Sequence, residues 1–355
     1  MNRLDEAAYL RLIRGETPGP LASMSRLALN VPSALYRLGA AARNLAFDRG
    51  WRTVHRAGVP VVSVGNLTLG GTGKTPMVEW VARWLRARSL RVAILSRGYG
   101  HQGGLNDEGR VLEENLPDVP HLQGADRVAL ARTAIEELES QVLVLDDGFQ
   151  HRRLRRDLDI VLLDALEPFG LGRIFPRGLL REPIGSLKRA NVVVLSRADL
   201  VTPSRRAEIQ AEAERRAGPL RWVEARHAPT LLVAADGTVE PLDRLTGLRV
   251  AAFCGIGNPE GFRRTLEALG ASVAGFRAFR DHHAYSGTDV AELGRWAGSL
   301  GADLLLTTQK DSVKLRVPSL GPMPLRALRI GLEILGGERT LDDALAAIQP
   351  ARSVS

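Results

Sequence analysis

The sequence predicts an α/β protein in which a doubly wound, mostly parallel sheet carries a P-loop and is joined to a second, smaller α/β domain. Short runs rich in valine and leucine alternate with helical stretches, as in a parallel sheet with crossover helices. These runs are residues 61–64, 91–96, 141–147, 159–164 and 191–196. A similar alternation resumes at residue 248, and 355 residues are enough for two domains of ordinary size.

The composition is that of a globular protein with an excess of positive charge. The single cysteine, Cys254, excludes a disulfide framework and a cysteine-based metal site. Residues 1–20 lack the apolar core of a signal peptide and no apolar run could span a membrane, so we expect a cytoplasmic protein. The net charge of +8 favours an anionic partner. Aromatic residues are only 5% and do not alternate with basic runs, so no nucleic-acid stacking platform is indicated.

The N-terminal segment, residues 21–56, is basic and amphipathic. It holds one acid, Asp48, and the arginines Arg26, Arg37, Arg43, Arg49, Arg52 and Arg56. After Pro32, a helix would place Leu35, Leu38, Ala42 and Leu45 on one face. Two interpretations stay open: a helix at a membrane interface with arginines on lipid phosphates, or a helix packed on the main domain with a solvated arginine face.

The P-loop is predicted at the end of the first strand. Residues 70–76 read GGTGKTP and lead into an amphipathic run that starts at Met77. Glycines let backbone N–H groups surround a phosphate, and the helix N-terminus adds a positive dipole end. The candidate nucleotide-binding residues are Thr68, Leu69, Gly70, Gly71, Thr72, Gly73, Lys74 and Thr75. The general motif has glycine at the first of these positions, where this chain has Thr68.

A Walker B strand is predicted at residues 141–147, which read QVLVLDD. A carboxylate at the end of such a strand lies beside the P-loop and binds Mg²⁺ directly or through water, while Thr75 supplies a hydroxyl. Because neighbouring strand residues point to opposite sides, Asp146 and Asp147 are expected to have different roles. The arginines at 152, 153, 155 and 156 follow closely, either to bind anionic groups or as a solvated surface.

The rest of the chain suggests a substrate loop and a second domain. Residues 169–183, rich in proline, glycine and arginine, are long for a bare connection, which indicates a substrate loop. The expected boundaries separate residues 1–50, the basic N-terminal segment; 51–220, the P-loop domain; 221–247, short strand-like pieces with turns; and 248–345, the smaller α/β domain. Glycines 255 and 257, after a strand, are a weak phosphate-loop signal that more often marks a bare turn.

These segments together resemble the tetraacyldisaccharide 4'-kinase family of the lipid A pathway. The motifs that carry the resemblance occur in the family's order from about residue 26 to 315. They are residues 62–76, 96–100 (SRGYG), 106–108 (NDE), 125–127 (ADR), 146–151 (DDGFQH), 177–183 (RGLLREP), 255–259 (GIGNP), 281–283 (DHH) and 308–311 (TQKD). The family pattern does not need glycine at position 68. It has glycine where this chain has Asn106, and glutamate where it has Gln309.

The resemblance implies a kinase that uses ATP and Mg²⁺. Residues 51–220 would be its P-loop kinase domain, with residues 1–50 as membrane-contact helices that are part of it, and residues 221–247 would be a β-linker to the smaller domain. It would transfer the γ-phosphate to the 4'-hydroxyl of an acylated glucosamine disaccharide 1-phosphate, the tetraacyldisaccharide 1-phosphate of lipid A biosynthesis. The family's N-terminal helix meets the inner leaflet, which favours the membrane interpretation of residues 21–48 and a peripheral location on the cytoplasmic face of the inner membrane. The expected partners are the lipid substrate and the anionic membrane surface, and no nucleic acid.

The resemblance also implies roles for individual residues. Asp107, paired with His282 from the other domain, would take the proton of the sugar hydroxyl, and Asp147 belongs to the same catalytic group. Thr75, Asp146 and Asp147 would hold Mg²⁺. Phosphate or sugar contacts would come from Arg127, His151 and Arg181.

Two other functions remain alternatives at this point. A P-loop GTPase or metallochaperone would need an Asn-Lys-x-Asp loop to read guanine, and residues 308–311 match it only in part. A nucleic-acid-binding ATPase is suggested only by the net charge.

Overall fold

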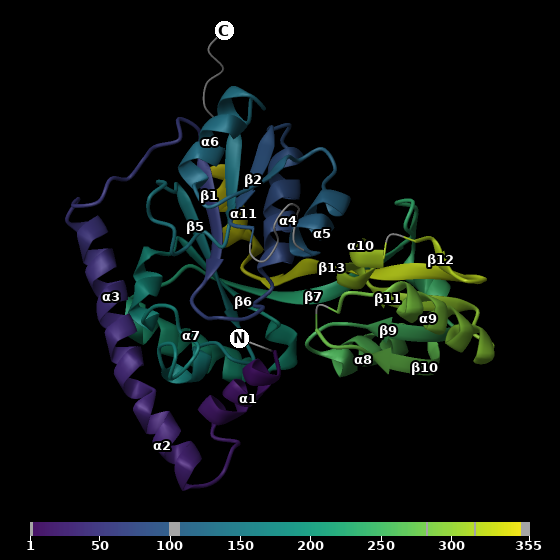
Figure 1. Cartoon of the computed structure of the whole chain (residues 1–355). Helices are drawn as coiled ribbons and strands as arrows, with labels where there is room; N and C mark the ends of the chain where they lie inside the picture. The colour runs from purple at the N-terminus through teal and green to yellow at the C-terminus, as the bar shows by residue number, and fades with distance from the viewer. Residues whose placement is uncertain (1–2, 99–106, 282, 316, 349–355) are drawn as a thin grey trace. The chain divides into compact units, whose positions relative to one another are not determined.

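The chain folds into two compact units, which are described separately (Figure 1). The computed structural model describes residues 3–98, 107–281, 283–315 and 317–348. Unit 1 comprises residues 1–97, 122–226 and 333–355, and unit 2 comprises residues 98–121 and 227–332. The chain first contributes residues 98–121 to unit 2. It enters that unit a second time within strand β7 (Trp222–Val233) and returns to unit 1 within strand β13 (Met323–Gly336).

A parallel sheet forms the centre of unit 1, in the order β7-β6-β5-β1-β4-β2-β3. Its other strands are β1 (Val61–Asn66), β2 (Val92–Ser96), β3 (His121–Gln123), β4 (Val142–Asp146), β5 (Leu158–Asp164) and β6 (Val192–Ser196). Every residue of β1, β2 and β6 is buried, which explains why these strands are mostly apolar. The expected doubly wound, mostly parallel sheet is confirmed.

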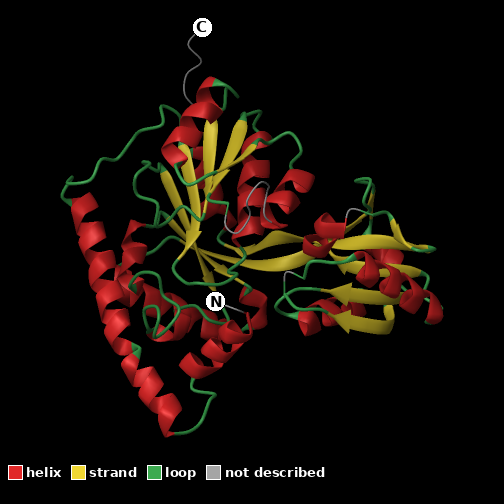
Figure 2. Ribbon diagram, viewed as in Figure 1, coloured by secondary structure: helices red, strands yellow, loops and turns green. Residues whose placement is uncertain are grey.

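Helices cover both faces of this sheet (Figure 2). On one face, α6 (Arg127–Glu136) and α7 (Pro203–Ala217) pack on alternate strand residues such as Leu143 and Val161. Helix α4 (Lys74–Arg86) packs on β1, β2 and β4 from the other side. Helix α11 (Glu338–Ala346), which follows β13, joins unit 1 again, where Asp342 accepts a 2.7 Å hydrogen bond from the Trp84 indole of α4. Short 3₁₀ segments of unit 1 lie at Gly170–Gly172, Ile184–Arg189 and Ala198–Leu200, and one of unit 2 lies at Leu242–Leu245.

Three helices precede the sheet of unit 1: α1 (Arg3–Arg14), α2 (Pro20–Ala28) and α3 (Asn30–Asp48). The fully buried carboxylate of Glu182 anchors α3, because it accepts hydrogen bonds from Arg43 at 2.9 Å and Asn44 at 3.0 Å. In contrast to this buried contact, a line of apolar side chains on α2 and α3 is exposed, and we call it the N-terminal stripe. Its residues, each 63–78% exposed, are Leu21, Met24, Leu27, Val31, Leu35 and Leu38. None of the helices in the described part of the chain is long and apolar enough to cross a membrane.

Unit 2 is a smaller α/β layer structure. Its parallel strands run in the order β10-β9-β11-β13, and β12 (Ser319–Leu320) pairs with β13 in the antiparallel sense. These strands are β9 (Arg249–Cys254), β10 (Ser272–Ala278) and β11 (Leu304–Thr308); β8 (Val239–Glu240) pairs with β7. Helix α8 (Pro259–Ala268) packs on one face and α9 (Gly287–Ser299) on the other.

The division into units differs from the expected domain boundaries at two places. Helix α5 (Asp107–Asn115) lies in unit 2, whereas the sequence suggested a place in the kinase domain. The reason is its packing on α10 (Gln309–Leu315), where Asn115 and Gln309 form a buried amide pair with bonds of 2.7 and 3.3 Å. The second difference is the C-terminal return to unit 1 after residue 332. Asp107 is therefore carried by the unit that also contains residues 281 and 283.

Candidate active site

The P-loop lies in unit 1, between the end of β1 and the start of α4. Gly70 and Gly73 have φ values of 113° and 84°, a conformation that favours glycine. Lys74 is the first residue of α4, so the loop delivers this lysine and Thr75 at a helix N-terminus. Backbone N–H groups and the helix dipole at such a position attract phosphate groups.

Neighbouring segments hold the P-loop in shape. The Asn66 side chain donates to Thr72 Oγ1 at 3.0 Å, and Ser196 Oγ, at the end of β6, donates to the Thr72 carbonyl at 2.8 Å. The Leu69 N–H donates to the carbonyl of Leu179 at 2.7 Å, which ties the loop to the segment before Arg181. These bonds fix the conformation of the loop without a ligand.

Asp147 lies between two cations, and we call this group the Asp147 cluster. Its carboxylate is 2.8 Å from Arg181 Nη1 and 3.6 Å from Lys74 Nζ. Burial raises the pKa of Asp147, but the charges of Lys74 and Arg181 outweigh it and leave the pKa below its ordinary value. The cluster has more positive than negative charge, which suits a polyphosphate.

Asp146 occupies the Walker B position. It ends β4 and pairs with Val64 of β1, directly before the P-loop. The turn that follows is tight, because a Cβ on Gly65 would lie 2.6 Å from the Cβ of Phe149. Asp147 has a φ of 55° in this turn, so its carboxylate leaves the strand in a different direction from that of Asp146. Different roles for the two carboxylates stay a prediction that this geometry favours.

The donor set suits Mg²⁺ shared with a nucleotide. In the described residues there is no group of three or more His, Cys, Asp or Glu side chains that could hold a metal by themselves. A magnesium ion in a phosphate-transfer site needs only one or two carboxylates and a hydroxyl, because phosphate oxygens and waters complete its coordination. Thr75 and Asp146 are the candidates for such a set, while Asp147 is engaged by Lys74 and Arg181.

Arg127 and His151 lie near each other in unit 1. Arg127 begins α6 and is 5% exposed, and Asp126 caps that helix by accepting from the N–H groups of residues 128 and 129. Burial lowers the pKa of His151 to about 4, and the charges of Arg127, Arg153 and Arg156 act in the same direction. His151 is therefore neutral at pH 7 and can offer a hydrogen bond without adding charge.

The candidate base Asp107 is in unit 2, at the start of α5. Its carboxylate is 3.9 Å from Lys314 Nζ of α10, and both side chains are largely buried. The other residue predicted for this role, His282, lies outside the described residues. The sequence singled out neither Lys314 nor Glu182, although Glu182 stands inside the motif at 177–183; both stand among other charged residues, so no local pattern marked them.

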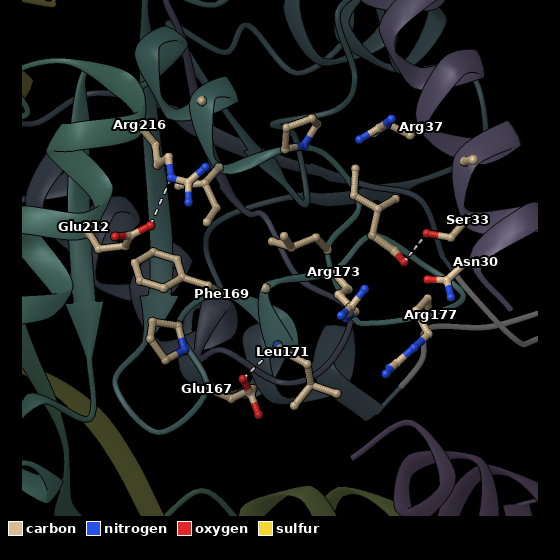
Figure 3. Close-up of a pocket in the computed structure, with 18 of the residues that line it drawn as sticks. Asn30, Ser33, Arg37, Glu167, Phe169, Leu171, Arg173, Arg177, Glu212 and Arg216 are labelled. Atoms are coloured by element: carbon tan, nitrogen blue, oxygen red, sulfur yellow. Dashed lines mark hydrogen bonds and ion pairs between the residues drawn. The ribbon is translucent and has the colours of Figure 1, made fainter. Parts of the chain in front are cut away.

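A groove of about 920 Å³ lies in unit 1 between α3, the segment 167–185 and α7 (Figure 3). We call it the arginine groove, because Arg37, Arg173, Arg177, Arg205 and Arg216 line it. Its two glutamates are engaged, since Glu167 accepts from the Leu171 N–H at 2.9 Å and Glu212 from Arg216 Nε at 3.0 Å. The expected substrate loop at 169–183 thus contributes to a cationic groove.

Comparisons with known proteins agree with one another. The family model described as Tetraacyldisaccharide-1-P 4'-kinase matches residues 25–349. The chain is 46% identical to a protein named tetraacyldisaccharide 4'-kinase from Anaeromyxobacter dehalogenans (strain 2CP-C), over 93% of each chain. It is 40% identical to the protein of that name from Geobacter sulfurreducens, over 90% of this chain and 92% of the other. A solved structure of LpxK from Aquifex aeolicus in complex with ATP matches with a TM-score of 0.74 and 31% identity, over 91% of this chain and 99% of that one.

Proposed function

The chain belongs to the Tetraacyldisaccharide-1-P 4'-kinase family, and on this premise we propose how its residues carry out the family's reaction. It is an ATP-dependent kinase of lipid A biosynthesis that transfers the γ-phosphate to the 4'-hydroxyl of tetraacyldisaccharide 1-phosphate. The observation that carries the phosphate-binding part is the Asp147 cluster beside the P-loop, where Lys74 and Arg181 share one carboxylate.

Nucleotide binding would use the backbone N–H groups of residues 70–73 and the ammonium of Lys74, because the predicted contribution of the Leu69 N–H is taken up by its bond to the Leu179 carbonyl. The negative triphosphate attracts Lys74 and Arg181 more strongly than the single charge of Asp147 does. Thr75 and Asp146, with Asp147 nearby, would hold Mg²⁺, which neutralises charge on the β- and γ-phosphates when bound. Arg127, His151 and Arg181 would contact phosphate or sugar.

In the transfer step, the 4'-oxygen forms a bond to the γ-phosphorus while the bond from that phosphorus to the ADP oxygen breaks. The hydroxyl proton passes to the carboxylate of Asp107. ADP leaves with the electron pair of the broken bond, and the sugar retains the phosphate. We assign His282 the supporting role that the family pattern gives it. The proposal requires Asp107, which unit 2 carries, to reach the acceptor hydroxyl when both substrates are bound.

The GTPase alternative fits the side chains of residues 308–311 poorly. The Asp311 carboxylate, which would have to read guanine, is fully buried and accepts hydrogen bonds from the Gly255 N–H at 2.9 Å and Thr308 Oγ1 at 2.6 Å. A base cannot reach an aspartate whose acceptor sites are already used inside the protein.

The direct test follows phosphate from γ-labelled ATP to the acylated disaccharide 1-phosphate in detergent micelles. We expect label on the lipid only when ATP, Mg²⁺ and the disaccharide are all present. Replacement of the lipid by DNA or RNA should give no stimulation of ATP turnover. Label that stays in ATP or appears only as free phosphate contradicts the assignment.

We also propose that the N-terminal stripe contacts the cytoplasmic face of the inner membrane. An exposed apolar line with helical spacing supports this proposal, and it disfavours a helix packed on the main domain through that face. The positive charge of the arginine groove suits anionic lipid headgroups or the phosphate of the substrate.

Vesicle cosedimentation tests this contact. Replacement of Leu27 and Leu35 by aspartate should reduce binding to anionic vesicles by about tenfold or more, because buried apolar area drives interfacial binding. The matched control replaces Leu138 and Leu200, exposed leucines on other segments of unit 1, and should bind as the unaltered protein does. Equal binding of both double variants would exclude the stripe as the contact.

A further inference from the structure

Lys314 is a buried lysine in unit 2 that lies between two carboxylates. Its Nζ atom is 2.8 Å from Asp311 Oδ1 and 3.9 Å from Asp107 Oδ2. The lysine and Asp107 side chains are only 10% and 13% exposed, and that of Asp311 is fully buried. A lysine with so little solvent contact needs charged partners, so these distances describe a built ion cluster. We call these three residues the Lys314 cluster.

Asp311 fixes one side of this cluster. Its other oxygen accepts hydrogen bonds from the Gly255 N–H and from Thr308 Oγ1, so the carboxylate cannot rotate without breaking both. The ammonium also lies 5.4 Å from the ring centre of Tyr285. Because Asp311 and Tyr285 hold Lys314 in place, its ammonium stays 3.9 Å from Asp107, where it acts on that carboxylate through its charge.

The two helices that carry the pair are held in register. Asn115 and Gln309 exchange hydrogen bonds of 2.7 and 3.3 Å at the other end of α5, and both side chains are buried. The glutamine at 309, where the family usually has glutamate, thus matches an asparagine on α5. This amide pair attaches α5 to α10, so the position of Asp107 relative to Lys314 is set by packing.

We propose that Lys314 is a positioning residue for Asp107: its ammonium holds the carboxylate in the orientation and ionised state that proton abstraction needs. The inference rests on the proposed role of Asp107 as the base. A cation alone would also weaken the base, but the second carboxylate, Asp311, balances the lysine charge. When Asp107 takes the hydroxyl proton, Lys314 keeps a partner in Asp311, so no unpaired buried charge is created.

The test compares two lysines on the same helix. Lys314→Met should lower kcat by about 10- to 100-fold, which is the usual cost of a displaced catalytic group. KM for ATP should stay within about threefold, because nucleotide binding belongs to the P-loop. Lys314→Arg should recover part of kcat. The matched control, Lys310→Met, should retain kcat within about twofold, because the exposed Lys310–Glu108 pair contributes little.

The pH profile separates positioning from a structural role. Loss of the Lys314 cation favours the protonated carboxylate, so the acidic limb of kcat/KM should move to higher pH in Lys314→Met and not in Lys310→Met. The charged and titratable groups of the described residues around the pair are Asp311, Lys310, Glu108, Tyr285, His283, Asp289 and Cys254. If Lys314→Met has a lower melting temperature but the acidic limb of its kcat/KM profile stays at the same pH, the inference is overturned.

Asp107→Asn in the same assay distinguishes a wrong assignment of the base from a wrong role for Lys314. If Asp107→Asn retains normal turnover, the base assignment itself is wrong. If Asp107→Asn is inactive while Lys314→Met has normal kcat and an unmoved limb, only the role of Lys314 is wrong. The double variant should be no slower than Asp107→Asn, because residues that act as one unit are not additive. If Lys314→Met does not fold, Lys314→Arg is tested in its place. We expect Lys314→Arg to have a reduced kcat and an acidic limb at the same pH as the unaltered protein. A normal kcat in Lys314→Arg would contradict the role.

Discussion

The Asp147 cluster of unit 1 and the Lys314 cluster of unit 2 contain the same kinds of groups in opposite proportion. In unit 1 one carboxylate, Asp147, lies between Lys74 and Arg181. In unit 2 one ammonium, Lys314, lies between Asp107 and Asp311. The first cluster has surplus positive charge and suits an incoming polyphosphate. The second has surplus negative charge and suits a carboxylate that must accept a proton. The charge balance of each unit therefore matches its half of the reaction.

The largest change should come from removing a cation of the Asp147 cluster. Lys74→Ala should lower kcat/KM for ATP by about 1000-fold, because a preorganised cation on the transferring phosphates is lost. Steady-state kinetics and equilibrium binding of a fluorescent ATP analogue measure the effect. Arg91→Ala is the control, since the exposed Arg91–Glu139 pair at 3.8 Å is also in unit 1 and should matter little. Equal kinetics for both variants would remove Lys74 from the nucleotide site.

In unit 2, Asp107→Asn should reduce kcat at least about 100-fold while ATP binding stays intact, which is typical for loss of an acid–base group. Single-turnover transfer to the lipid and nucleotide binding are measured on the same preparation. Glu108→Gln, the next residue on α5, is half-exposed, pairs with Lys310 and should behave like the unaltered protein. An equal loss of ATP affinity in Asp107→Asn would erase the distinction between the two clusters.

The glycines near the two clusters differ in the space that their neighbours leave for a side chain. A Cβ on Gly65, beside Phe149, would meet its neighbour at 2.6 Å, whereas a Cβ on Gly255, beside Asp311, would meet its nearest neighbour at 3.0 Å. Gly65→Ala should lower the free energy of unfolding by about 2 kcal/mol, within the usual range for overpacking, and Gly255→Ala by less. Urea unfolding of both variants measures this, and a larger loss for Gly255→Ala would reverse the expected order.

The smallest effect concerns two histidines. The pKa of His151 in unit 1 and of His121 in unit 2 is lowered to about 4, mainly by burial. Arginines add repulsion only at His151, so added salt should raise the pKa of His151 and leave that of His121 nearly unchanged. NMR titration at two salt concentrations resolves this. Because the unfolded chain binds these protons near pH 6.5, the free energy of unfolding should fall as pH drops from 6.5 to 4.

The sequence was most informative where local order sets structure. The strand, glycine turn and helix around Lys74 are contiguous, so their spacing predicts both fold and chemistry, and the parallel sheet follows from the alternating apolar runs. The unit to which α5 belongs was not predictable in this way. Asn115 meets Gln309 through packing between segments 194 residues apart, and no local pattern encodes that contact. The ion pairs of Lys314 with Asp107 and of Arg181 with Asp147 have the same origin.

The return of the chain to unit 1 after residue 332 has a consequence for biosynthesis. Trp84, on the helix that begins with Lys74, bonds to Asp342, and the ribosome reaches Asp342 only after it has made all of unit 2. During translation, unit 1 therefore cannot complete the packing of α4 until unit 2 has been synthesised. A nascent chain that stalls inside the insertion would lack α11, and its P-loop helix would miss this support.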